Sequence, residues 1–460
     1  MPFNHLPLEI HEMIVVEYET DPSRVEASSK DLLKNTLALS QINRRFRALS
    51  LSDRHQDLWS IIHLLWPREA VEEFVRRCEY QDLTIFLKTR IPSNRKRTEE
   101  VERWISFFLS NMDRIVSLQL DIPLGRAGRD IADTIADTPA PRLHSLALHL
   151  DETDRENAGI RRLLDYNAPN LQQARIHANL PFELQSFPSL RVLTLRASHH
   201  NFKGLLGMLG TMTEQLEILR LNGVKRWDLQ VLPPDLLAPL VLTACTFLCI
   251  ANFDAHRVCY IISNIHLPNL NQLTIKEKVV QALVDGAFLS SLFPTLPRIN
   301  AEGVDSLYLG IYCNRFVVEM PGYQYETNWR HLAKQQITLL PLVIDIVHAL
   351  ADHLDSHPIT LIVESGITSS EWSEPDPAFL TLPDVDQLID VVFAAFSWVQ
   401  RLKVGGNINP PIHALFDPSQ LPNLTDLIIQ TQSKAKFACD YTRESLAQLA
   451  KQRKIKIARR

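Results

Sequence analysis

Glycine is scarce in this chain, with 14 among 460 residues, whereas proline is frequent at 27. This balance suits many short elements that end at proline. An excess of one charge is also lacking, because 48 basic and 53 acidic residues leave a formal charge of −5. So small a charge gives no reason to expect a nucleic acid or a membrane surface as a partner. An apolar fraction of 45% with 22% charged residues is typical of a globular protein, and the length allows several domains or one long repeat array.

Paired cysteines and a signal peptide are lacking as well. The N-terminus has no basic flank followed by an apolar core, so we expect no export. Without export, the cysteines are expected to be reduced thiols of a protein in the cytoplasm, the nucleus or both. Six cysteines occur, without the paired spacing of a zinc site or a disulfide framework: Cys78, Cys245, Cys249, Cys259, Cys313 and Cys439.

One long run lacks charge, at residues 236–253, and it approaches the length of a membrane span. It contains Pro239 and Asn252, and Asp235 and Asp254 flank it without any Lys or Arg bias. We therefore predict two consecutive buried strands and no membrane segment.

Catalytic constellations are missing too. Gly-x-Ser-x-Gly does not occur, and the best metal candidate is a group of histidines and aspartates between residues 345 and 357. His353 and His357 would share a helical face, but Pro358 ends the helix and no Glu is placed as a base. We predict a solvated polar face, no metal, no cofactor and no enzymatic activity. The residues considered are Asp345, His348, Asp352, His353 and His357.

The most informative stretch that is present covers residues 6–62. It opens with Leu6-Pro7-Leu8-Glu9-Ile10, in which proline suits the first turn of a helix. Apolar residues at helical spacing predict one helix through Ile14 and a second through Leu49. Three short helices cannot bury so much apolar surface among themselves. The rest of the chain or a partner must therefore cover part of it.

This stretch resembles an F-box, which combines Leu-Pro-x-Glu-Ile, a Leu-rich helix ending in Arg-Arg-Phe-Arg, and a closing Leu-Trp. F-box proteins dock on the Skp-type adaptor of cullin ubiquitin ligases. More residues than usual separate the two helices, including Thr20-Asp21-Pro22-Ser23, and we predict that they form an inserted loop. The alternative is a helical cap with a chance motif. The resemblance implies nine adaptor contacts: Leu6, Pro7, Ile10, Ile14, Leu39, Ile42, Phe46, Leu58 and Trp59.

Further along, a short pattern recurs: apolar-x-x-apolar-x-apolar. The first five starts are separated by 28, 28, 19 and 26 residues, and several follow a proline. Helical patterns precede some of them, as at residues 99–112 before the strand at 115–120. Such self-similarity predicts stacked helix–strand units, each of which buries the apolar face of its neighbour. The starts are Ile115, Leu143, Leu171, Leu190, Leu216, Leu270, Val304, Val399 and Leu424.

These units resemble degenerate leucine-rich repeats, although the usual Asn eight residues after the first Leu is largely absent, so we expect irregular turns. The whole chain thus resembles the F-box/leucine-rich-repeat class, and particularly the F-box-like families of mushroom-forming fungi. The resemblance implies an α/β fold with an F-box-like helical domain at residues 1–63. Residues 64–460 would form an irregular leucine-rich-repeat solenoid, a horseshoe of helix–strand units with parallel strands on its concave face.

Two insertions are candidate contact surfaces. Residues 312–330 gather aromatics that could anchor a target, or form a hairpin packed on the repeat edge. Residues 365–383 are expected to form a mobile acidic loop, or to dock a basic segment. Basic clusters at 94–97 and 451–460 are interpreted as a loop and a charge-guarded edge strand, with nuclear import or RNA contact as the alternative. The aromatic candidates are Phe316, Tyr323, Tyr325 and Trp329.

The resemblance implies the substrate-recognition subunit of an SCF-type E3 ubiquitin ligase, in which the F-box binds the Skp-type adaptor and the repeats bind an unknown protein target. The alternative is a leucine-rich-repeat scaffold for protein–protein interaction without a ligase role. An unrecognised hydrolase or metal enzyme would require a polar cluster gathered in a pocket.

Overall fold

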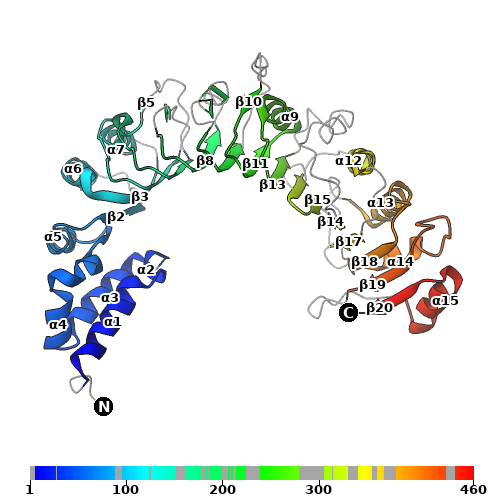
Figure 1. Ribbon diagram of the computed structural model, residues 1–460, viewed down its shortest axis with the longest axis horizontal. Helices are drawn as coiled ribbons and strands as arrows, with labels where there is room; N and C mark the ends of the chain where they lie inside the picture. Colours follow the sequence, from blue (N-terminus) through cyan, green and yellow to red (C-terminus); the bar gives the residue numbers. More distant parts are fainter. Residues whose placement is uncertain are drawn as a thin grey trace. The chain divides into compact units, whose positions relative to one another are not determined.

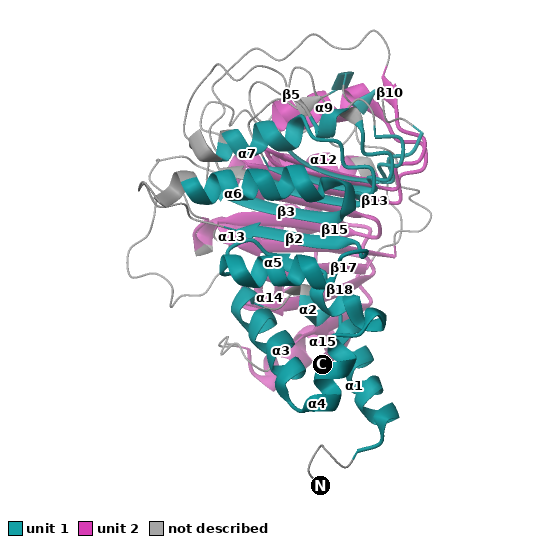
Figure 2. Cartoon of the chain, turned by 90° about the vertical axis from the view of Figure 1, so that its left-hand side faces the viewer, with its two compact units in different colours: residues 1–217 teal, residues 218–460 magenta. Residues whose placement is uncertain are grey.

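The computed structural model describes residues 6–26, 28–88, 96–123, 126–151, 161–177, 182–183, 187–197, 206–207, 209–210, 214–223, 239–278, 305–312, 314–329, 340–354, 360–366, 380–430 and 441–459. The chain divides into two compact units, Met1–Glu217 and Ile218–Arg460 (Figure 2). The chain has an α/β fold with mostly parallel strands. The domain boundary expected after residue 63 stays a prediction.

Unit 1 begins with helices, and two expectations about them need correction. The inserted segment is largely helical, with a break at Asp21 and Pro22 rather than a loop. The predicted second helix is two helices, because Asn43 ends one and caps the next by accepting a hydrogen bond from the backbone N–H of Phe46 at 2.9 Å. The elements are α1 (Leu8–Thr20), α2 (Ser23–Glu26), α3 (Ser29–Gln41), α4 (Arg44–Ser50) and the 3₁₀ segment η2 (Asp53–Trp59).

A parallel sheet follows in unit 1, and its strands confirm the predicted strand starts. Helices α5, α6 and α7 lie over one face of this sheet (Figures 1 and 2). The strands, in sheet order, are β1 (Ile61–His63), β2 (Leu83–Lys88), β3 (Ile115–Pro123), β4 (Ser145–Asp151), β6 (Gln173–His177) and β8 (Val192–Ala197). The helices are α5 (Arg68–Arg77), α6 (Lys96–Asn111) and α7 (Arg126–Ala136), and β5 (Arg161–Arg162) pairs separately with β7 (Phe182–Glu183).

The recurring apolar pattern determines the register of this sheet. Leu118 is paired with Leu146, Leu146 with Ala174, and Ala174 with Leu193. These side chains are at most 2% exposed, as expected where alternate residues of each strand face the helices. The period found in the sequence thus becomes a row of neighbours across the sheet.

The strands of unit 2 are parallel to their neighbours except around β15. Helices α9, α12, α13 and α15 of this unit lie on one side of the strands (Figure 1). In sheet order the strands are β9 (Ile218–Gly223), β11 (Phe247–Phe253), β13 (Gln272–Lys278), β16 (Tyr323–Asn328), β15 (Arg315–Met320), β14 (Ser306–Tyr312), β17 (Thr360–Ser365), β18 (Arg401–Gly406), β19 (Asp426–Ile429) and β20 (Lys456–Arg459). The helices are α9 (Ala255–Asn264), α12 (Leu340–Leu354), α13 (Leu382–Ala395), α14 (Asn409–Ala414) and α15 (Arg443–Arg453), and β10 (Leu240–Val241) pairs separately with β12 (Ile265–His266).

The aromatic segment at residues 312–330 is a hairpin rather than an exposed loop. Strands β15 and β16 fold back between β13 and β14, so that β14 pairs with β17. The four predicted target contacts are therefore corrected to interior residues, because alternate positions of the hairpin face the core. Their exposures are 0% for Phe316, 2% for Tyr323, 0% for Tyr325 and 0% for Trp329.

The usual repeat Asn is largely absent, and another Asn supplies hydrogen bonds to the backbone of the turns before the strands. The Asn of a recurring Pro-Asn-Leu start donates its amide to a carbonyl of the preceding turn. Asn170 bonds to the Pro141 carbonyl at 2.8 Å, Asn269 to Thr243 at 2.8 Å, and Asn423 to Ser397 at 3.2 Å. These bonds link successive turns and satisfy backbone groups there.

Several remaining expectations have mixed outcomes. Within residues 236–253, β10 and β11 are strands as predicted, although Val241 of β10 is 41% exposed. No helix in the described ranges has the length and apolarity to cross a membrane. Cys78 and Cys245 are buried, whereas Cys249 and Cys259 are half-buried. The tail forms strand β20. Lys96 and Arg97, predicted as part of a basic loop, belong to α6 instead. Residues 94–95, the acidic segment at 367–379, Val304, Cys313, His357 and Cys439 lie outside the described residues.

Candidate functional site

The N-terminal helices leave an apolar surface open. On α1, Ile10, Met13 and Val16 follow one another at three-residue spacing and remain exposed. Met13 is 65% exposed, and Ile42 after α3 is 44% exposed. Exposed apolar side chains on successive turns of one helix, as on α1, are typical of a contact surface. We call this set the N-terminal apolar surface: Leu8, Ile10, Met13, Val16, Ile42 and Leu51.

The nine residues predicted to contact an adaptor divide between surface and interior. Pro7, Ile10 and Ile42 are exposed, and Leu6 and Ile14 are half-buried. Four others are buried, which corrects their assignment as contacts available to a partner: Leu39, Phe46, Leu58 and Trp59.

The physical reason is that the two buried aromatics hold the helices together. The Phe46 ring packs edge-on against His11, with 4.7 Å between ring centroids. The Trp59 indole donates to the Ser50 carbonyl at 2.7 Å, and the Arg77 guanidinium lies 3.9 Å above its ring. The sequence-based set of contacts missed the exposed residues Leu8, Met13, Val16 and Leu51, although helical spacing alone could have suggested Met13 and Val16.

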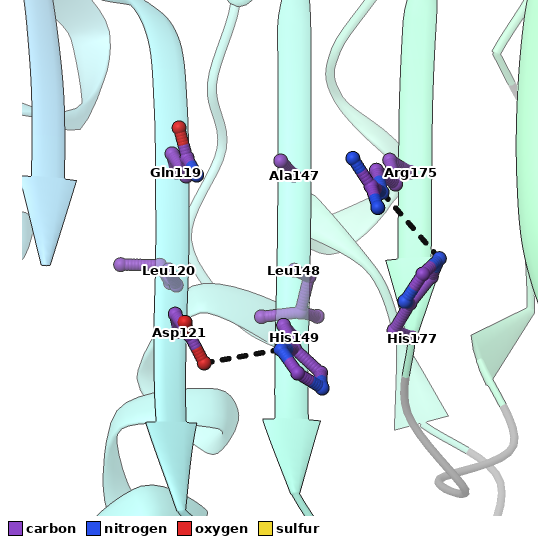
Figure 3. A pocket seen from close by; sticks show the side chains of 8 residues that line it. All are labelled: Gln119, Leu120, Asp121, Ala147, Leu148, His149, Arg175 and His177. Atoms are coloured by element: carbon purple, nitrogen blue, oxygen red, sulfur yellow. Dashed lines mark hydrogen bonds and ion pairs between the residues drawn. The ribbon is translucent and has the colours of Figure 1, made fainter. Parts of the chain in front are cut away.

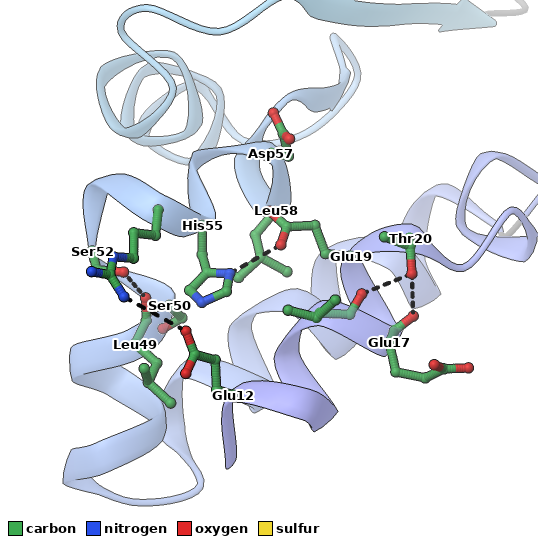
Figure 4. A network of polar contacts seen from close by, with 12 residues as sticks. Glu12, Glu17, Glu19, Thr20, Leu49, Ser50, Ser52, His55, Asp57 and Leu58 are labelled. Carbon is green, nitrogen blue, oxygen red and sulfur yellow. Dashed lines mark hydrogen bonds and ion pairs between the residues drawn. The ribbon is translucent and has the colours of Figure 1, made fainter. Parts of the chain in front are cut away.

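A polar network beneath this surface fixes α1 against η2. The imidazole of His55 lies 3.0 Å from the Glu19 carboxylate (Figure 4). Arg24, which is 4% exposed, donates to the carbonyls of Glu19 at 3.0 Å and Leu58 at 2.8 Å. Burial lowers the pKa of this guanidinium from its ordinary value. These contacts explain how short helices present a defined surface.

A second candidate is a polar hollow on the open face of the unit 1 sheet (Figure 3). Its lining comes from β3, β4 and β6, and its polar side chains alternate with buried residues such as Leu120 and Leu148. Ala147 lies in the middle, and its small side chain leaves the space. We call this site the strand hollow, and its lining is Gln119, Leu120, Asp121, Ala147, Leu148, His149, Arg175 and His177.

Two rows of paired residues cross the strand hollow. One row is Asp121, His149 and His177, and the other is Gln119, Ala147 and Arg175. His149 Nδ1 lies 3.0 Å from Asp121 Oδ1, and the rings of His149 and His177 have centroids 5.6 Å apart. Arg175 Nε lies 3.4 Å from His177 Nε2. Burial lowers the pKa of His177 to about 4, and the positive charges of Arg175, His149 and Arg196 add to this effect. His177 is therefore neutral at neutral pH, in a place of positive potential.

Sequence reasoning missed the strand hollow, but a signal for it existed. Asp121, His149 and His177 are separated by 28 residues each, which is the repeat period. The register places Asp121 beside His149, and His149 beside His177. The polar residues that recur every 28 positions could therefore have indicated the site from the sequence alone.

A third polar group lies on the strands of unit 2. The Tyr308 hydroxyl lies 2.9 Å from the Tyr312 hydroxyl and donates to Glu364 at 3.0 Å. The Arg315 guanidinium lies 4.4 Å above the Tyr312 ring. These half-buried side chains, and not the interior aromatics of the hairpin, are the aromatic residues of this region that a partner could reach.

The comparisons leave the chain without a family. No family model matches it, and no curated protein is significantly similar to it in sequence. Within the residues that the structure describes, no group of three or more His, Cys, Asp or Glu side chains is placed to hold a metal ion.

Proposed function

We propose that the chain is the substrate-recognition subunit of an SCF-type ubiquitin ligase. In this proposal residues 1–63 are an F-box-like domain that binds a Skp-type adaptor, and residues 64–460 are degenerate leucine-rich repeats that bind a target protein. The observation that carries it is the N-terminal apolar surface, which accompanies the Leu6-Pro7-Leu8-Glu9-Ile10 motif. Ubiquitin transfer would belong to other subunits, while this chain raises the effective concentration of target lysines.

The energetics of this surface support a partner. Covering a Leu, Ile or Met side chain contributes roughly 1.5–3 kcal/mol. The exposed positions on α1 and after α3 together could thus supply much of a stable contact, while the buried aromatics contribute only by holding the helices in place. Adaptor binding is therefore expected to depend on Met13 and Ile42 directly, and on Phe46 only through folding.

Co-purification with a Skp-type adaptor tests the proposal. Met13→Asp combined with Ile42→Asp should remove the adaptor from the purified chain, because charges cannot be desolvated in an apolar contact. Leu109→Asp is the matched control, since Leu109 on α6 is 61% exposed and lies outside the surface. Circular dichroism should show the same helix content in all three proteins. Equal recovery of adaptor with both variants would exclude the contact.

A second function, that of a repeat scaffold without a ligase role, also has an observation in its favour. Trp66 donates its indole N–H to the Ser29 carbonyl at 2.9 Å, and Trp59 packs edge-on against Phe74 at 4.9 Å between centroids. These contacts tie the helices to β1 and α5, as a cap on the sheet would be tied. A scaffold would bind no adaptor, so the same co-purification separates the two functions.

A further inference from the structure

We propose that the strand hollow binds an acidic side chain of a partner protein, and that His177 takes up a proton when the acid binds. This inference deepens the proposed function, because it gives the chemistry of the target that the repeats would hold. The inference rests on the proposed function only for the fate of the bound protein, and the binding of the acidic side chain does not depend on it.

The first argument is charge. On the open face of β2 to β8, cationic or protonatable side chains lie around the carboxylate of Asp121. His149 contacts this carboxylate at 3.0 Å, and Lys88 lies 4.0 Å from it. Arg175 makes no ion pair with a carboxylate among the residues that the structure describes, and it is exposed. An anion beside Arg175 and His177 would therefore meet the positive charge of Arg175, which no carboxylate of the described residues neutralises.

The second argument is size and access. The hollow has a volume of about 160 Å³, below the roughly 300 Å³ at which pockets for small molecules begin. A volume of this size suits one side chain. The helices of unit 1 that Figure 2 shows over the sheet, α5 to α7, lie on the opposite face. An extended segment of another protein could therefore cross the strands and insert an acidic side chain.

The third argument is the protonation of His177. The groups around it are Arg175 on its own strand, His149 and Asp121 from β4 and β3, and Arg196 from β8. The cations among them and the partial burial keep the free imidazole neutral, and its pKa is lowered to about 4. The negative charge of a carboxylate placed beside the ring stabilises the protonated imidazole and raises its pKa. The bound state should then hold a proton that the free state lacks, so affinity rises as pH falls.

A protein is favoured over a nucleic acid as the partner. The positive patch spans only a few side chains, whereas nucleic-acid binding draws on many phosphate contacts. A single acidic side chain, a carboxylate or a phosphorylated residue, matches the patch in size and charge.

Binding of labelled peptides to the full-length protein tests the inference. Oligoaspartate should bind and oligoasparagine should not, and a single phosphoserine in the asparagine peptide distinguishes phosphate from carboxylate as the preferred anion. Arg175→Gln should weaken the binding of oligoaspartate about fivefold. Arg142→Gln is the matched control, because Arg142 pairs with Asp82 outside the hollow, and it should change little.

The pH dependence tests the role of His177. If binding returns its pKa to the ordinary value of 6.5, affinity should rise about fourfold from about pH 7.5 to pH 6. His177→Gln should bind as wild type does at the higher pH and lose this rise. A rise that persists in His177→Gln would overturn the proton uptake.

Three other results of these binding experiments would also decide against the proposal. Equal weakening by Arg142→Gln and Arg175→Gln, no binding of either anionic peptide, or tighter binding of a single-stranded RNA would overturn the acidic partner. Adaptor recovery should be unchanged in Arg175→Gln. Loss of the ligase link would appear as failure of the wild type to recover adaptor, while peptide binding stays intact.

Discussion

At the scale of single residues, the interior of unit 2 contains a carboxyl group that titrates near neutrality. Glu277 of β13 is 3% exposed, and it accepts a hydrogen bond from the Tyr325 hydroxyl at 2.5 Å. Burial raises its pKa to about 7, against the effect of the Tyr325 bond, and the nearby Asp254 raises it further. Asp254 itself forms an ion pair with Arg257 at the start of α9.

This raised pKa predicts that stability falls as pH rises. The folded state keeps the Glu277 proton up to about pH 7, whereas the unfolded chain releases it near its ordinary value of 4.5. The favourable contribution is therefore complete below pH 4.5 and is lost by pH 7, at a cost of about 3 kcal/mol. Glu277→Gln, which keeps an acceptor for Tyr325, should unfold at a higher temperature than wild type at pH 8. The difference should shrink toward pH 5.

Thermal unfolding followed by circular dichroism across this pH range provides the measurement. Glu319→Gln on β15 is the control, because Glu319 is exposed and its removal should leave the pH dependence unchanged. A gap between Glu277→Gln and wild type that stays constant with pH would contradict the assignment.

Residue-scale features also limit what the sequence could predict of the candidate contact surface. Helical spacing correctly identified Ile10, Ile42 and Phe46 as apolar positions of the N-terminal helices. It could not decide which faces inward, because Phe46 is buried by His11, which lies far away in sequence. The break between α3 and α4 likewise depends on the N-cap residue Asn43, which cannot be recognised from the spacing of apolar residues.

At the scale of elements, the hairpin of β15 and β16 is the largest departure from the repeat pattern. Its aromatics predicted either a loop or a packed hairpin, and only the alternation of Tyr323, Tyr325 and Thr327 with polar residues separates the two. The order β16-β15-β14 requires the hairpin to fold back, and nothing in the local sequence specifies which neighbour it joins. The single strands, by contrast, followed directly from their apolar spacing.

The turn of this hairpin gives a prediction at the same scale. Gly322 has φ +75°, and a Cβ there would lie 2.6 Å from the Asn271 carbonyl oxygen. Gly322→Ala should therefore lower the free energy of unfolding by about 1–3 kcal/mol, since both the backbone and the carbonyl resist it. Gly207→Ala is the control, because its Cβ would meet nothing within 4 Å. Chemical denaturation of both variants measures the effect, and equal midpoints would contradict it.

At the scale of the whole molecule, the repeat period was the most predictive property of the sequence. A spacing of 28 residues brings Gln119, Ala147 and Arg175 side by side, just as it aligns the buried leucines one position away. The site was missed because the pattern was read for its apolar positions only. The chemistry of the strand hollow arises from three successive strands, and no single stretch of sequence contains it.

The pairing of each strand with its nearest neighbours also predicts which strands of unit 2 a destabilising substitution affects. Strand β18 pairs only with β17 and β19 in the described sheet, and Leu402, its second residue, is fully buried. Leu402→Ala should cost about 2–5 kcal/mol locally. In a stack where each strand depends on its neighbours, the loss should weaken with distance. Amide hydrogen exchange should therefore accelerate most in β17 to β19 and least in β9 and β11.

Mass spectrometry of exchanged peptides resolves this gradient, with Lys403→Ala on the same strand as the control. Lys403 is half-exposed on the opposite face, so its loss should leave exchange in β17 and β19 near the wild-type rate. Equal acceleration from β9 to β20 in Leu402→Ala would show that unit 2 opens only as a whole. In that case its strands would share one cooperative core, and the repeat units would have no separate stability.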